Sequence, residues 1–119
     1  MSVSGLKKIE AAIAAHKRKT ARGMRAGLIM AGLFLQREAQ LIVPVDTTDL
    51  KESANTRPEG KGMDTQVVVS FGTEYAVYVH ENLEARHAPG KQAKFLETPL
   101  REKGDRMAEI VVETMRTVL

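Results

Sequence analysis

The stretch from residue 6 to residue 42 contains no proline, and it constrains the fold more than any other part of the chain. Its apolar residues mostly recur at intervals of three, four or seven, as on one face of an α-helix: Leu6, Ile9, Ile13, Met24, Leu28, Ala31, Leu35 and Ile42. Pro44 ends this helix, because the residue before a proline avoids helical backbone. At 1.5 Å per residue the helix measures about 55 Å, which exceeds the diameter of a small domain.

The two halves of this predicted helix differ in character. Residues 1–25 carry seven basic side chains and one acidic side chain, a net charge of +6, whereas the whole chain has only +3. Residues 26–35 are apolar on nearly every side, so they must be buried. Gly23, Gly27 and Gly32 each weaken a helix by up to about 1 kcal/mol relative to alanine, and they mark either a bend or a close helix crossing. Both one long helix and two shorter ones remain compatible with this pattern.

The middle of the chain predicts a small antiparallel sheet. Asp49 to Ser53 is expected to form one helical turn, residues 55–57 begin a strand, and residues 58–62 turn the chain. Gln66 to Phe71 is rich in β-branched residues and completes a hairpin, with Phe71 directed into the core. Residues 75–79 fit a further strand or a short buried helix, and residues 87–90 are expected to be a loop.

The end of the chain predicts a second helix, from Pro99 to Val118. Thr98 is its expected N-cap, and Pro99 occupies the first helical position, where its missing N–H costs nothing. One apolar stripe follows, composed of Leu100, Met107, Ile110 or Val111, Met115 and Val118. The sequence therefore predicts a single α+β domain over residues 1–119: a basic helix (1–42), sheet and loops (43–97), and a helix packed on the sheet (98–119).

Composition and motifs exclude several classes of function. The chain has no cysteine, so disulfides, thiolate metal sites and a cysteine nucleophile are excluded. Residues 26–35 are too few to span a bilayer, so we expect synthesis in the cytoplasm and no membrane partner. No nucleophile elbow or glycine-rich phosphate loop occurs, and we therefore expect neither an enzyme nor a cofactor.

Two groups of residues invite a metal interpretation. His80 and Glu81 are followed by His87, but the intervening residues cross an expected loop and do not place two imidazoles on one helical face. Asp46, Asp49 and Glu52 form an acidic series without the glycine and the full ligand set of a calcium loop. We expect hydrogen-bonded or solvated histidines, turn capping by the acidic series, and no metal.

The charged run on the first helix is the main functional candidate, and it comprises Lys17, Arg18, Lys19, Arg22 and Arg25. Such side chains neutralise DNA phosphates without reading sequence, and they equally suit a solvated face or an acidic protein partner. If several copies formed a ring around a DNA channel, the same side chains could serve both contact with DNA and contact with a protein partner. The predicted hairpin tip is a second candidate interface, with Pro58, Gly60, Lys61 and Gly62.

Three short blocks of sequence carry a family resemblance. The first has Pro44, Asp46, Thr47, Leu50 and Ser53; the second has Tyr75, His80 and Glu81; the third has Phe95, Leu96 and Pro99. In this order and spacing they resemble the tail-component, tail-completion or neck proteins of long-tailed double-stranded-DNA bacteriophages and prophages. Thr48 departs from the pattern, because the family usually has glycine there.

The resemblance implies a structural role in the virion. It implies a homo-oligomeric ring at the junction of head and tail, in contact with tail-terminator or head-closure proteins and with DNA in the channel as a further candidate partner. It brings no catalytic residues. A small basic DNA-binding or regulatory protein is the alternative that the charge pattern leaves open.

Overall fold

The computed structural model describes residues 3–43, 48–72, 75–79, 85–87 and 94–118. The elements along the chain are α1 (Val3–Ile42), α2 (Thr48–Glu52), β1 (Ala54–Glu59), the 3-10 helix η2 (Gly62–Asp64), β2 (Gln66–Phe71), β3 (Tyr75–Val79), β4 (Ala85–His87) and α3 (Lys94–Val118). The fold is α+β, as the sequence predicts. Its dimensions of 68 × 24 × 20 Å are those of a rod, because α1 is much longer than the body around it.

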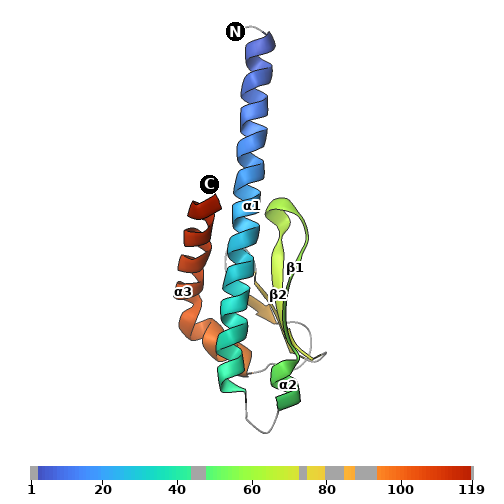
Figure 1. Ribbon diagram of the computed structural model, residues 1–119, viewed down its shortest axis with the longest axis vertical. Coiled ribbons are helices and arrows are strands. Elements are labelled where there is room, and N and C mark those ends of the chain that lie inside the picture. Colours follow the sequence, from blue (N-terminus) through green and yellow to red (C-terminus); the bar gives the residue numbers. More distant parts are fainter. Residues whose placement is uncertain (1–2, 44–47, 73–74, 80–84, 88–93, 119) are drawn as a thin grey trace.

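Helix α1 is one continuous helix of 40 residues, which resolves the choice between one helix and two. The sheet lies along one side of its second half, and α3 lies along another side (Figure 1). The first half projects beyond both. The apolar residues of the second half are buried where these layers meet, and Leu28, Ala31 and Leu35 are fully inaccessible to solvent.

The sheet is an antiparallel meander with strand order β1-β2-β3-β4. In the β1–β2 hairpin Ala54 pairs with Phe71, and Glu59 pairs with Gln66. Residues 75–79 form a strand rather than a helix. The expected loop at residues 87–90 is wrong at its first residue, because His87 pairs with Val77 and ends β4.

An aromatic cluster links the sheet to the start of α3. Phe71 is fully buried, and its ring meets the ring of Phe95 edge-on, with 5.0 Å between the centroids. The ring of Tyr75 also meets that of Phe95 edge-on, with 5.4 Å between the centroids. The prediction that Phe71 points into the core is confirmed. The first turn of the C-terminal helix thus packs on the sheet.

The predicted start of the C-terminal helix is wrong. Helix α3 begins at Lys94, so Thr98 is not its N-cap and Pro99 lies inside the helix. The burial of Phe95 and Leu96 supplies the reason, because their packing stabilises a turn that precedes the proline and offsets the hydrogen bond that Pro99 cannot donate. The backbone then leaves helical geometry at Lys103, and the part of α3 beyond this kink runs along α1 (Figure 1).

The helical glycines mark close contacts rather than a bend. A methyl group on Gly27 would lie 2.9 Å from the carbonyl oxygen of Val111 in α3. A methyl group on Gly32 would lie 2.6 Å from a methyl of Val67 in β2. Glycine therefore lets α1 approach α3 on one side and the sheet on the other.

Candidate assembly surface

The projecting first half of α1 is the most distinctive surface of the molecule. We call residues 3–22 the helical extension. Lys17, Arg18, Lys19 and Arg22 are exposed on it, and Arg25 is exposed just beyond it. Within the described part of the chain, none of these five side chains forms an ion pair. Their exposure makes them candidates for contact with a partner.

The predicted hairpin tip is partly confirmed by the backbone. Gly60 and Gly62 have positive φ angles of 82° and 56°, which non-glycine residues rarely adopt. Lys61 is exposed between them. Pro58 belongs to β1 rather than to the tip, and it pairs with Val67. A proline is tolerated there because β1 is an edge strand, where one of the two ladders is missing.

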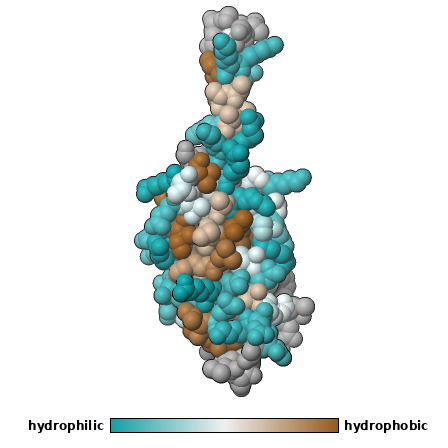
Figure 2. Space-filling model, viewed as in Figure 1, coloured by the Kyte–Doolittle hydropathy of each residue, from teal (hydrophilic) through white to brown (hydrophobic). Residues whose placement is uncertain are grey.

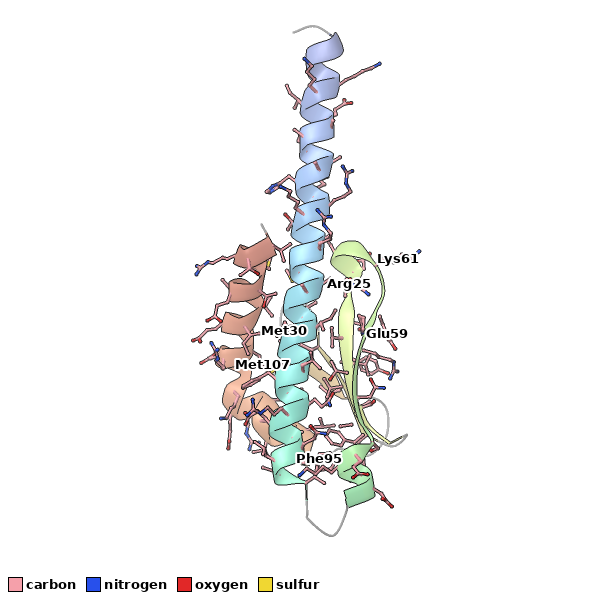
Figure 3. All side chains as sticks on the ribbon, in the orientation of Figure 1. Arg25, Met30, Glu59, Lys61, Phe95 and Met107 are labelled. Atoms are coloured by element: carbon pink, nitrogen blue, oxygen red, sulfur yellow. The ribbon has the colours of Figure 1, made fainter. Side chains whose placement is uncertain are left out.

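The structure brings the basic helix and the hairpin tip together. An open groove of about 480 Å³ separates them, and it is lined by His16, Lys17 and Thr20 of α1 and by Met63 of η2. The Thr20 hydroxyl donates a hydrogen bond to the carbonyl oxygen of His16, so it is satisfied within the helix. Figure 3 shows Lys61 at the hairpin tip and Arg25 on α1 beside the hairpin. The two predicted interface elements thus form one continuous surface.

Two large apolar side chains are exposed on the helical extension. Ile9 is 46% exposed and Ile13 is 52% exposed. Ile13 lies five helical turns from Ala31, so it is on the face of α1 that the body buries. The core-facing stripe of α1 therefore continues onto the extension, where neither α3 nor the sheet covers it (Figure 1).

The body also carries exposed apolar side chains. Met30 and Leu33 of α1 are 49% and 44% exposed, and Val112 of α3 is 46% exposed. Figure 2 shows apolar residues gathered across the middle of the body, among hydrophilic ones. The prediction that residues 26–35 are buried as a whole is therefore wrong for the outer face of α1.

The outer face of α3 forms a second groove, of about 340 Å³. It is lined by Ala108, Glu109, Val112, Glu113 and Arg116. Arg106 donates to Glu109 at 3.0 Å and to Glu113 at 3.1 Å. These hydrogen bonds raise the pKa of Arg106 above its ordinary value, and the bond to Glu109 has the larger effect. The groove thus has an apolar floor and a rim with two carboxylates and the guanidinium group of Arg116, and no sequence motif predicts it.

The described motif residues are placed in the core or in turns. Ser53 donates a hydrogen bond to the carbonyl oxygen of Leu50, which packs on the core. Tyr75 and Phe95 form the aromatic cluster, while Leu96 and Pro99 are buried in α3. The remaining motif residues lie outside the described residues: Pro44, Asp46, Thr47, His80 and Glu81.

The metal candidates extend beyond the described residues, since His80, Glu81 and Asp46 are not among them. Where side chains are described, no group of three or more histidine, aspartate or glutamate residues is placed to hold a metal ion. Over the same part of the chain, no helix combines the length and the apolar character needed to cross a membrane.

No protein-family model matches the chain, and no curated protein or solved structure is significantly similar to it. The family resemblance therefore depends on the three short sequence blocks alone. The geometry adds an independent clue to function, because it exposes a charged and partly apolar helix.

Proposed function

We propose that the protein is a structural component of a bacteriophage virion, of the neck or tail-completion type, which joins tail to head as a homo-oligomeric ring. The observation that carries the proposal is the helical extension. Most of this extension lies beyond α3 and the sheet (Figure 1), so the exposed apolar side chains of Ile9 and Ile13 favour burial against a partner. The family resemblance supplies the biological setting.

The proposed partners follow from the same surface. Tail-terminator or head-closure proteins would contact the helical extension and the adjoining hairpin tip at Lys61. Double-stranded DNA in the channel would be contacted by the exposed basic side chains of α1. The protein would be made in the host cytoplasm and incorporated into the virion, with no catalytic step and no cofactor.

Deleting the gene from its phage or prophage should give DNA-filled heads separated from tails, and infectivity should be lost. Electron microscopy of the lysate and plaque counts measure both effects. Wild-type protein supplied in trans is the control, and it should restore joined particles. A variant with Ile9→Asp and Ile13→Asp should not restore them, because both side chains are exposed and their replacement leaves the core intact. Normal tailed, infectious particles from the deletion would contradict the proposal.

A second candidate function is favoured by the exposed basic residues of α1. As a small DNA-binding or regulatory protein, the isolated chain should bind duplex DNA with an affinity that falls steeply as salt rises. Changing Lys17, Lys19 and Arg22 to glutamine should make the plot of log affinity against log salt shallower, by about 0.9 for each phosphate that the variant no longer neutralises. Lys51→Gln, in α2, is the matched control and should leave the slope unchanged. Fluorescence anisotropy measures the slope, and absence of binding at low salt would exclude this function.

A further inference from the structure

We infer that the helical extension binds an amphipathic helix of another protein, one whose apolar stripe is flanked by acidic side chains. This inference rests on the proposed function, because it specifies the chemistry of the virion partner that contacts the extension. The partner helix would lie along α1 in line with α3, beyond the point where α3 ends (Figure 1).

The face of α1 that α3 covers continues onto the extension. In the body this face holds Gly23 and Gly27, which lie against α3. Counting back from Gly23 in steps of three, four, three and four residues gives a set that we call the docking stripe: Thr20, His16, Ile13 and Ile9. Positions at this spacing share one face of a helix, and two helices pack side by side through them. Ile9 and Ile13 are 46% and 52% exposed, so α3 leaves this part of the stripe uncovered.

The groove beside the extension offers a place for an apolar side chain of the partner. It is lined by His16, Lys17 and Thr20 of α1 and by Met63 of η2. Two of these residues, His16 and Thr20, belong to the docking stripe. Met63 is 47% exposed, and its flexible thioether side chain can adapt to the shape of what it contacts. A helix packed on the stripe would therefore also contact the hairpin tip.

Basic side chains flank the docking stripe on both sides. Lys17 directly follows His16 and Lys19 directly precedes Thr20, which places the two lysines on opposite edges of the stripe. Both are exposed. The extension as a whole carries six basic side chains and one acidic side chain. Opposite charges at such flanking positions favour the pairing of two helices and like charges oppose it, so the complementary helix is acidic.

The helices of a second copy do not have this chemistry. A second extension is itself basic, so like-charge repulsion disfavours its pairing with the first. The outer face of α3 carries Arg106 and Arg116 beside Glu109 and Glu113, so its charge is balanced. Helix α2 has only five residues. The acidic helix therefore belongs to a different protein.

Duplex DNA is the other partner that basic side chains could attract. Contact with phosphates would neutralise the lysines, but it would not bury the apolar side chains of Ile9, Ile13 and Met63. An amphipathic helix matches both the charge and the apolar stripe, so the structure favours the helix over DNA.

Two synthetic peptides test the inference. Each spans about three heptads, with leucine at the stripe positions and glutamine at the remaining ones, and the flanking positions are glutamate in one peptide and lysine in the other. The wild-type protein should bind the glutamate peptide about tenfold or more tightly than the lysine peptide. The double variant Lys17→Glu, Lys19→Glu should reverse this preference. Isothermal titration calorimetry measures both affinities.

Two further variants separate position from total charge. The double variant Lys7→Glu, Arg18→Glu makes the same change in net charge, but both residues lie on the face of the extension opposite the docking stripe, so the preference for the glutamate peptide should persist. The double variant Ile9→Ala, Ile13→Ala should weaken binding of the glutamate peptide by about tenfold or more and leave the affinity for duplex DNA unchanged. All of these side chains are exposed, and circular dichroism checks that each variant is folded.

Each outcome decides for or against the inference. A wild-type protein that binds neither peptide, or binds both equally, would overturn it, and so would isoleucine variants that bind like the wild type. Loss of the preference in the Lys7 and Arg18 variant would show that total charge decides, as it does for duplex DNA, and would overturn it as well. If the preference and its reversal are observed while phage lacking the gene form normal particles, the helix-binding site stands and the neck function fails. If that phage loses joined particles but the peptides do not bind, the neck function stands and the helix-binding site fails.

Discussion

Replacing Phe71 with alanine should lower the free energy of unfolding by about 3–5 kcal/mol. The Phe71 side chain is fully buried, so its removal leaves a cavity between the sheet and the helices. It also removes the edge-to-face contact with Phe95, a kind of pair that contributes about 0.5–1.5 kcal/mol beyond burial. Since Phe95 is in the first turn of α3, the variant should weaken the attachment of this turn to the sheet. Urea unfolding followed by circular dichroism measures the loss.

The matched control for this truncation is Leu41→Ala. Leu41 is 67% exposed near the end of α1, so its truncation should change the free energy of unfolding by no more than about 0.5 kcal/mol. A double-mutant cycle with Phe95→Ala should give a positive coupling between the two rings. If Phe71→Ala costs no more than Leu41→Ala, the ring is not in the core and the described packing is wrong.

Sequence patterns were sufficient where local rules determine structure. The absence of proline before Pro44 and the regular spacing of apolar residues predicted a helix that the structure ends at Ile42. The β-branched run from residue 66 to residue 71 predicted β2 with its observed bounds. Positive φ angles at Gly60 and Gly62 agree with the predicted turn. In each of these segments the local conformational preference of the residues agrees with the structure that the whole fold imposes.

Tertiary contacts decided the features that the sequence did not predict. Strand β4 has three residues, too few for a periodic signal, and it is defined by pairing with β3. Helix α3 begins before Pro99 because Phe95 and Leu96 pack into the core. Apolar spacing indicates the face of a helix but not the element that covers it. No sequence pattern therefore indicated that α3 leaves Ile9 and Ile13 uncovered.

The candidate assembly surface also has features that residue types predict and features that only tertiary contacts determine. The basic run at Lys17 and the hairpin tip at Lys61 were identified from residue types alone. Their meeting at the groove lined by Met63 depends on how the β1–β2 hairpin lies along α1, which no local rule supplies. The α3 groove depends on the exposed side of an amphipathic helix, where charged residues such as Glu109 are ordinary.

The three glycines of α1 show how a local weakness supports a tertiary contact. Within a helix, alanine is more favourable than glycine by up to about 1 kcal/mol, so each glycine lowers the stability of isolated α1. At Gly23 a new methyl group would meet Met115 of α3 at 3.5 Å, an ordinary contact. At Gly27 it would lie 2.9 Å from the Val111 carbonyl oxygen and 3.0 Å from the Val111 Cα. Both of these Val111 atoms belong to the backbone, so the clash at Gly27 can be relieved only if α3 moves as a whole.

Gly23→Ala should therefore raise the free energy of unfolding by up to about 1 kcal/mol, whereas Gly27→Ala should lower it. Overpacking against backbone typically costs about 1–3 kcal/mol, which exceeds the gain in helix propensity for most of that range. The two variants make the same chemical change one turn apart on α1, so each is the control for the other. Thermal and urea unfolding measure both. Equal stabilisation by the two substitutions would show that α1 and α3 do not approach closely at Gly27, and the described crossing would then be incorrect.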